Sequence, residues 1–422
     1  MRGELHFDAV VIGAGTAGLT AATRLAEGGA HVCVLAKGVG STHLAPGTID
    51  VLGYAPERVE DPERALADFV AARPDHPYAL VGADAVAAAL QWISDRVCDG
   101  PQPGYRYVGG LERNHLLPTA VGVARPSALV PETMAEGEVR SEEPVCVVGT
   151  RVLRDFHAAL CAANLERAGV AARAIDVELE LDRADANALG LARRFDDAAW
   201  RAAFAGSLAP MLRADERVAL PAVLGMRDPH GAWADLQRRL GRPVFEIATL
   251  PPSVPGMRLF DVLSGALRRA GGRLVLGSEV VGAERSGDRI AAVRAHAAGH
   301  DVRYHARWFV LATGGFNSGA IELASDWIAR DVVLGLPLRG APGPAEVRFV
   351  GEYFAEQPMA RAGIAVDGSL RAEGAENVLV AGAALPGAVP WHEGSGEGIA
   401  LSSGYRAAQV VLETSRTEAA RA

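Results

Sequence analysis

Lysine is almost absent from this sequence, and positive charge is not in excess. Lys37 is the only lysine among 42 basic residues in a chain of 422, and the formal net charge at pH 7 is −9. A chain with this balance has no global basic field to attract nucleic acid. We therefore expect no nucleic-acid partner.

Cysteine and long apolar runs are also scarce. The four cysteines stand at positions 33, 98, 146 and 161, without a CxxC pair or a Cys/His grouping of zinc spacing. Iron–sulfur and zinc sites need closer groupings, so we expect no metal site. No stretch of 18 apolar residues occurs, and the N-terminus has no apolar signal region. These absences predict a cytoplasmic location, with any membrane contact made through a partner.

The first 36 residues have the pattern of a βαβ unit that binds a phosphate. The apolar run FDAVVI at 7–12 is followed by Gly13, Gly15 and Gly18 in GxGxxG spacing, then by a helical segment and the strand AHVCVLA. A helix N-terminus placed after such a loop offers free N–H groups and positive potential to an anion. The alternative is a glycine-rich turn without a ligand.

One residue that usually accompanies this pattern is missing. An Asp or Glu about 20 residues after the glycines normally holds the adenosine ribose of a dinucleotide. Here that position falls near Ala36, and no acidic residue occurs between Glu27 and Asp50. The phosphate site is therefore predicted without its usual ribose ligand.

The last third of the chain contains the elements that would complete the same fold. A helix, a run of short strands ending on VLATGG, and a glycine-rich loop before a closing helix follow in order. We predict an α/β fold: a Rossmann-like GxGxxG flavin-binding domain with an inserted cap domain. Its parts are 1–60, 258–320 and 360–412, with 61–257 as the insertion and 413–422 as a frayed tail. The closing helix, from about Gly396–Gly398, would supply the positive potential that a reduced flavin needs near N1 and O2.

Six motifs spread over nearly the whole chain resemble the B subunit of the bacterial anaerobic glycerol-3-phosphate dehydrogenase. They are IGAGTAGL, STHLAPGTIDVLG, TAVGVARPSALVP, TLPPSVPGMRL, FVLATGGFNSG and HEGSGEGIALSSGYRAA. The resemblance implies an FMN flavoprotein within a quinone-linked dehydrogenase that oxidises sn-glycerol 3-phosphate to dihydroxyacetone phosphate. It also implies two partners: an FAD-containing subunit that oxidises the substrate, and an iron–sulfur subunit that anchors the complex to the membrane.

FMN has one phosphate and no adenosine ribose, which is consistent with the apolar residue at position 36. FAD remains the alternative, because some FAD sites satisfy the ribose through backbone or water. The candidate cofactor-binding residues are Gly13, Gly15, Gly18, Lys37, Ser41, Thr42, Thr313, Gly314, Gly315, Gly394, Ser395, Gly396 and Gly398. For Lys37, the alternative is a solvated charge at the end of a strand.

His43, His392 and Glu393 are the candidates for catalytic chemistry. His43 lies where the chain would cross the flavin, and His392 with Glu393 would form a proton-handling pair before the glycine loop. The alternatives are a hydrogen-bonded structural histidine and a loop cap. Arg125 and Arg258 are candidate anion ligands, with a structural ion pair as the alternative for each.

Two main functional classes remain open from the sequence, beside a third, weaker alternative in which the flavin-binding fold of the subunit is purely structural. The first is an electron-transferring flavoprotein subunit of a dehydrogenase complex. The second is a self-sufficient FAD-dependent dehydrogenase or reductase of the fumarate-reductase-like group, acting on a small acid. Oxidising a substrate requires a positioned base and substrate anchors, and the sequence shows no compact His/Arg constellation for a dicarboxylate. This favours the first class.

Overall fold

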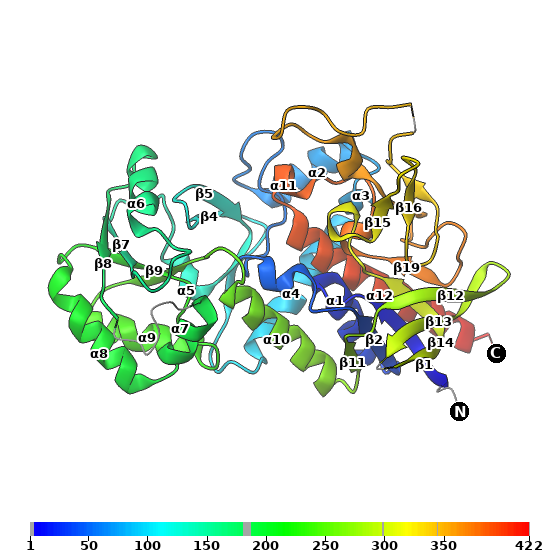
Figure 1. Ribbon diagram of the computed structural model, residues 1–422, viewed down its shortest axis with the longest axis horizontal. Helices are drawn as coiled ribbons and strands as arrows, with labels where there is room; N and C mark the ends of the chain where they lie inside the picture. The colour runs from blue at the N-terminus through cyan, green and yellow to red at the C-terminus, as the bar shows by residue number, and fades with distance from the viewer. Residues whose placement is uncertain (1–3, 180–186, 298, 344, 422) are drawn as a thin grey trace.

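The chain folds around two sheets, each with its own apolar core. The computed structural model describes residues 4–179, 187–297, 299–343 and 345–421. The larger sheet and both ends of the chain lie on one side of the molecule, and the smaller sheet lies on the other (Figure 1). Helix α10, Val254–Arg269, runs between the two.

The larger sheet has seven strands in the order β11-β2-β1-β14-β13-β12, with β19 paired to the end of β14. The pairs β11–β2, β2–β1, β1–β14 and β14–β19 are parallel, and β12–β13–β14 form an antiparallel meander. The strands are β1 (Glu4–Ile12), β2 (Val32–Ala36), β11 (Arg273–Leu276), β12 (Val280–Ser286), β13 (Arg289–Ala297), β14 (His300–Leu311) and β19 (Val378–Val380).

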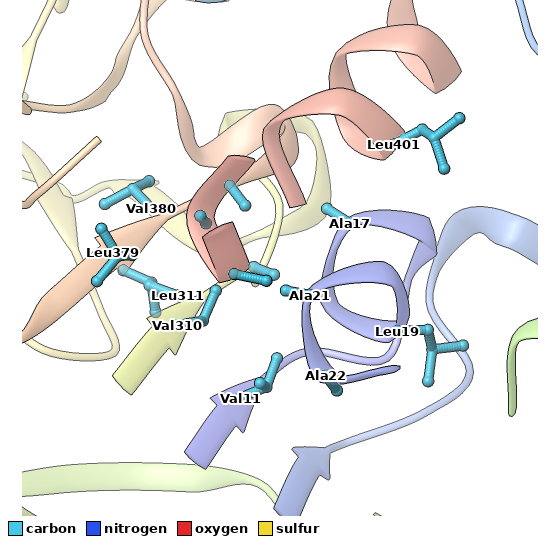
Figure 2. Packing of buried hydrophobic residues seen from close by; sticks show 14 of the residues in the cluster. Val11, Ala17, Leu19, Ala21, Ala22, Val310, Leu311, Leu379, Val380 and Leu401 are labelled. Carbon is cyan, nitrogen blue, oxygen red and sulfur yellow. The ribbon is translucent and has the colours of Figure 1, made fainter. Parts of the chain in front are cut away.

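Helices α1 (Thr16–Glu27) and α12 (Gly396–Ala419) pack together beside this sheet. In α1 the buried residues are mostly small, and Ala17, Ala21 and Ala22 are nearly inaccessible. Figure 2 shows these alanines among Val11 of β1, Val310 of β14 and Leu401 of α12. Small side chains allow the helix axis to approach the strands and α12 closely, which brings the N-termini of both helices to one edge of the sheet.

The smaller sheet is entirely parallel, in the order β10-β9-β7-β8. Three of its four strands are buried at every residue, as expected for short apolar strands covered by helices on both faces. Its strands and helices are β7 (Val145–Gly149), α6 (Ala158–Arg167), β8 (Ala172–Asp176), α7 (Ala188–Phe195), α8 (Ala198–Leu208), β9 (Arg217–Pro221), α9 (Pro229–Leu240) and β10 (Val244–Ile247).

Short elements connect and cover the two sheets. Several helices begin where the sequence places a capping side chain before proline: Asp61 caps α2, Asp228 caps α9 and Ser253 caps α10. The remaining elements are α2 (Pro62–Ala72), α3 (Pro77–Val81), α4 (Ala83–Cys98), β3 (Tyr107–Gly109), β4 (His115–Pro118), β5 (Ala124–Ser127), β6 (Leu129–Pro131), α5 (Glu132–Ala135), β15 (Ile321–Leu323), β16 (Ala329–Asp331), β17 (Leu338–Arg339), β18 (Gly363–Ile364) and α11 (Pro390–Glu393).

The residues that form the two cores indicate a different boundary for the inserted unit than the expected 61–257. Buried residues of α2, α3 and α4, from Leu66 to Val97, belong to the core of the larger sheet. The core of the smaller sheet runs from Ala120 to Val254. We propose that the inserted unit begins near residue 115 rather than at 61. The segment expected to fray from 413 continues α12 to Ala419, with Arg371 bonded to Thr414 and Arg307 paired with Glu418.

A buried ion pair joins the two sheets. The guanidinium of Arg258, on α10, contacts both carboxylate oxygens of Glu246, on β10, at 2.7 and 3.0 Å, and both side chains are fully buried. Glu246 also accepts hydrogen bonds from the Thr133 hydroxyl and the Leu224 N–H. Arg258 therefore forms a structural ion pair, which was the alternative to its interpretation as an anion ligand.

Replacing Arg258 with methionine should destabilise the protein strongly. The change leaves the Glu246 carboxylate buried without its cation, which typically costs about 3–5 kcal/mol. Urea unfolding followed by circular dichroism measures the loss. The matched control is Lys37→Met, which removes the cation of an exposed ion pair and should cost no more than about 1 kcal/mol. Equal costs for the two variants would contradict the role assigned to Arg258.

Candidate functional site

The three glycines of the GxGxxG motif have different surroundings. Gly13 has φ 113°, and a Cβ atom there would collide with the carbonyl oxygen of Ala312. A Cβ at Gly18 would collide with the carbonyl oxygen of Gly13. At Gly15, in contrast, no heavy atom beyond its chain neighbours lies within 4 Å of a built Cβ in the part of the chain described. Gly13 and Gly18 thus allow the strand, loop and helix to pack, and Gly15 borders open space.

The N-terminus of α1 opens beside Gly15. Gly15 is the N-cap residue, no side-chain hydrogen bond caps the helix within the described residues, and its first turn carries no acid. The first N–H groups of an α-helix have no partner inside the helix and attract an anion. Open space at Gly15 together with uncapped N–H groups fits the phosphate of a flavin.

The segment after β2 lies against this loop. Ala36 ends the strand as a buried residue. Lys37 extends to Glu279 on the surface, with 3.0 Å between Nζ and Oε1. This position agrees with the alternative interpretation of Lys37 as a solvated charge at the end of a strand. Gly40 has φ 72°, and a Cβ there would lie 2.9 Å from the Gly15 nitrogen. A side chain at position 40 would therefore crowd the phosphate loop.

Three segments that are distant in sequence meet at Thr16. Its hydroxyl donates to Oε2 of Glu397 at 2.8 Å and lies 3.3 Å from the hydroxyl of Thr42. Thr42 is fully buried in the turn 41–44, whereas Ser41 is exposed. Glu397 stands in the first turn of α12 and was not among the predicted residues. Burial raises the pKa of its carboxyl to about 7, against the opposing effect of the Thr16 hydrogen bond.

Residues 313–315 also lie beside the glycine loop. Strand β14 ends at Leu311, opposite Ile12, and a Cβ at Gly13 would come within 3.3 Å of the Thr313 nitrogen. Gly314 and Gly315 are closely packed, the first against Ser318 and the second against the carbonyl of Ala383. The structure therefore brings Thr313 to the candidate phosphate site and gives the two glycines a packing role.

Glu393 and His392, expected to act together, point to different surroundings. Glu393 is buried, and its carboxylate contacts His76 Nε2 at 3.1 Å, the Ser395 hydroxyl at 2.7 Å and the Val389 N–H at 2.9 Å. Burial alone would raise the pKa of Glu393, but these contacts outweigh it and lower the pKa. His392 is exposed beside Trp391. Glu393 anchors the loop of Gly394, Ser395 and Gly396, while Gly398 bonds through its N–H to the Asp50 carbonyl.

His43 stays close to the candidate site. It shares the turn of Thr42, and its partly buried ring meets the edge of Phe260 at 4.9 Å between centroids. Burial lowers the pKa of His43, and the charge of Asp261 opposes this shift. A neutral imidazole at this position remains a candidate hydrogen-bonding group towards a flavin.

Arg125 is held by an acid that sequence reasoning missed. Its guanidinium pairs with Asp50, which is buried and also accepts hydrogen bonds from Ser127 and Thr48. Asp50 and Arg125 both act electrostatically on Glu397, the first raising its pKa and the second lowering it. The Asp50–Arg125 pair therefore lies next to the site formed by Thr16, Thr42 and Glu397.

Exposed apolar side chains gather in one region of the chain. Leu385 and Val389, in the loop before α11, are buried, while Trp391 is half exposed. Tyr353 is 86% and Phe354 82% exposed, and Phe349 and Trp327 line a common groove of about 620 Å³. We call the exposed residues Trp327, Ile328, Phe349, Tyr353 and Phe354 the apolar patch. Patches of this kind commonly mark interaction surfaces.

Neither a metal cluster nor a membrane span is found among the described residues. There, the search for three or more grouped His, Cys, Asp or Glu side chains gives none. Within the same ranges, no helix combines the length and hydropathy needed to cross a bilayer.

Comparison with known proteins identifies relatives over the full length. The model of the FAD binding domain family matches residues 8–399. The B subunit of anaerobic glycerol-3-phosphate dehydrogenase from Pectobacterium carotovorum subsp. carotovorum is 32% identical over 424 residues, covering 97% of this chain and 99% of the relative. A probable B subunit of the same enzyme from Halobacterium salinarum is 33% identical, with coverages of 98% and 100%. Among solved structures, 3-ketosteroid Δ1-dehydrogenase from Sterolibacterium denitrificans has a TM-score of 0.46 at 14% identity, covering 97% of this chain and all of that one.

These matches confirm two predictions made from the sequence. The α/β, Rossmann-like fold class agrees with the family and with the observed sheet. A flavin is confirmed as the class of cofactor. The individual cofactor-binding and catalytic residues stay predictions, supported for Gly15 and Thr42 by the geometry described above.

Gly15→Val should abolish flavin binding without unfolding the protein. The free space at this position accepts the side chain, but the valine would occupy the space predicted for the phosphate. We expect a colourless protein with a near-native circular dichroism spectrum, measured beside visible absorbance. Gly206→Val on α8, where a built Cβ also meets no heavy atom within 4 Å in the described structure, is the control and should retain flavin. Full flavin occupancy in Gly15→Val would disprove this location.

Proposed function

The chain belongs to the FAD binding domain family and, within it, to the B subunits of anaerobic glycerol-3-phosphate dehydrogenase, and we propose that it serves as the electron-transferring flavoprotein of such an enzyme. In this role it takes part in oxidation of sn-glycerol 3-phosphate to dihydroxyacetone phosphate and passes electrons towards quinone. The observation that carries the proposal is the meeting of the glycine loop, the turn 41–44 and the start of α12 at Thr16.

This arrangement supports binding and orientation of a flavin by the chain's own groups. The free N–H groups at the start of α1 would hold the phosphate, and Gly15 leaves it room. The start of α12 would face the ring with its positive end. When bound, the flavin supplies the ability to accept two electrons and to release them singly.

The side chains available for substrate binding favour electron transfer over substrate oxidation. Arg125 is paired with Asp50 and Arg258 with Glu246, so both candidate anion ligands are already neutralised. Glu393, a candidate base, is held by His76 and Ser395. A self-sufficient dehydrogenase would need such groups directed at a substrate. The glycerol 3-phosphate is therefore assigned to a partner protein.

The end of β2 supports FMN as the cofactor. Ala36 is apolar and buried where a ribose-binding acid usually stands, and the neighbouring Lys37 contacts Glu279. A flavin mononucleotide requires neither an acid nor a second phosphate site there. FAD is the alternative.

Two partners are proposed: an FAD-containing subunit, which oxidises the substrate, and an iron–sulfur subunit, which anchors the complex to the membrane. Relatives named as a B subunit imply an enzyme of several subunits. The apolar patch supports contact with another protein, because side chains such as Tyr353 and Phe354 are costly to leave in water. We place the chain at the inner face of the cell membrane, attached through its partner.

Acid release of the cofactor from purified protein, followed by mass spectrometry, should yield FMN. The prediction follows from the missing acid near Ala36. The FAD-containing partner, purified in the same way, should yield FAD and calibrates recovery. Recovery of FAD from this chain would refute the FMN assignment and leave the flavin site in place.

The flavin-loaded chain alone should not oxidise glycerol 3-phosphate with an artificial dye, because its candidate substrate ligands are already paired. Turnover should appear when both partner subunits are added. The flavin-free Gly15→Val variant, mixed with the same partners, should lower electron transfer from the FAD-containing partner to the acceptor and serves as the control. Robust turnover by the chain alone would instead establish the self-sufficient dehydrogenase.

A further inference from the structure

We propose that the carboxyl of Glu397 is a proton acceptor coupled to flavin reduction, taking up one proton when the bound flavin accepts two electrons. The inference rests on the proposed flavin site. It adds a role for a residue that the glycine motifs did not indicate.

Glu397 lies where the two helices expected to hold the cofactor, α1 and α12, meet. It occupies the first turn of α12, and Oε2 accepts the Thr16 hydroxyl hydrogen bond at 2.8 Å. Thr16 directly follows Gly15, where the space for a ligand opens. The Thr42 hydroxyl completes the row at 3.3 Å from that of Thr16. Glu397 thus stands in the first turn of the helix that the proposed site places against the flavin ring, so a change in the charge of the ring acts on this carboxyl.

The electrostatic requirement of a reduced flavin conflicts with an ionised Glu397. The start of α12 would stabilise negative charge on the ring, and a carboxylate in the first turn cancels part of that effect. The hydroxyl of Thr16 is a neutral partner and does not compensate the charge. Adding negative charge to the ring makes ionisation of Glu397 less favourable, so reduction should draw a proton to it.

The surroundings set the starting point near neutral pH. Burial raises the pKa of Glu397 to about 7 before any flavin charge acts on it. The facing charged groups are Asp50, which raises the pKa further, and Arg125, which lowers it. Asp50 and Arg125 form an ion pair, and because their charges have opposite sign, their effects on the pKa of Glu397 oppose each other. The Tyr107 phenol, from β3, also faces Glu397, and burial keeps its pKa well above the usual value, so it stays neutral.

The proton balance is explicit. Oxidised flavin accepts two electrons and one proton at N5 to give the anionic reduced form. The Glu397 carboxylate accepts one further proton to give the neutral acid. The electrons come from the substrate-oxidising partner in the complex or from dithionite in a test. Both protons leave when the electrons pass to the acceptor.

The test is the number of protons taken up per two electrons, measured with a pH indicator in weak buffer as the flavin-loaded chain is reduced by dithionite. The protons that dithionite releases on oxidation to sulfite are measured separately with ferricyanide, an oxidant that takes up no proton, and are subtracted. The wild type should take up more than one proton from about pH 7 up to the higher pKa that Glu397 has beside the reduced flavin, and one proton above that pKa. Glu397→Gln keeps an oxygen acceptor for Thr16 and should take up one throughout. Glu413→Gln, an exposed acid on the same helix, is the matched control and should follow the wild type.

Two results would overturn the inference. The first is uptake of a single proton by the wild type over about pH 6 to 9, which needs no variant to be stable. The second is a wild-type profile in Glu397→Gln. Flavin content is measured first: a wild type without flavin would refute the proposed function itself, whereas a flavin-loaded wild type with single-proton uptake refutes only the role of Glu397.

Discussion

The parallel pairing of β1 with β14 is the constraint on which the structure depends. Strand β1 is apolar from Ala9 to Ile12 and pairs with parallel strands on both sides. Because parallel strands require a crossover connection, the strands that bury β1 cannot follow it through a short hairpin turn. Its two sides are filled by β2, which follows at once, and by β14, from the last third of the chain. All segments between β2 and the returning strands must leave the sheet and come back, and the second sheet is built within that excursion.

The same pairing assembles the candidate site. In register with Ile12, Leu311 delivers Thr313 to the glycine loop, and β19 beside β14 leads to the loop that starts α12. The return from the inserted unit passes through α10, whose Arg258 is held by Glu246 of the second sheet. Packing of the inserted unit thereby fixes the position of α10, and the turn at Thr42 and His43 rests on α10 through the His43 carbonyl and the Ser253 N–H. The inserted unit thus acts on the site through the position of α10 and through two of its own side chains, Arg125 and Ser127, which hold Asp50 beside it.

Local signals in the sequence predicted local structure well. The βαβ opening, the glycine spacing and the closing strand–loop–helix depend on neighbouring residues, and the structure has them where expected. The long-range partners of polar residues could not be predicted. Glu393 looks equally suited to His392 beside it and to His76, and only the fold selects His76. The helices at 62–98 have apolar faces, but the sequence of such a face does not reveal which sheet it will cover. We expected these helices in the inserted unit, whereas their buried residues belong to the core of the larger sheet.

Most buried acids in this protein are balanced by a cation from another element. Asp50 has Arg125 and Glu246 has Arg258, so each carboxylate is paired where burial would otherwise make its charge costly. Glu393 instead accepts hydrogen bonds from His76, Ser395 and the Val389 N–H. Glu397, which is partly buried, differs from the two ion-paired acids because its hydrogen-bond donor is the neutral hydroxyl of Thr16. The ionised form of a carboxyl in that position is only weakly stabilised. Added negative charge nearby therefore protonates Glu397 before it protonates the acids that are paired with arginine. A flavin relay, which gains and loses charge in each cycle, is the setting in which such an imbalance has a use.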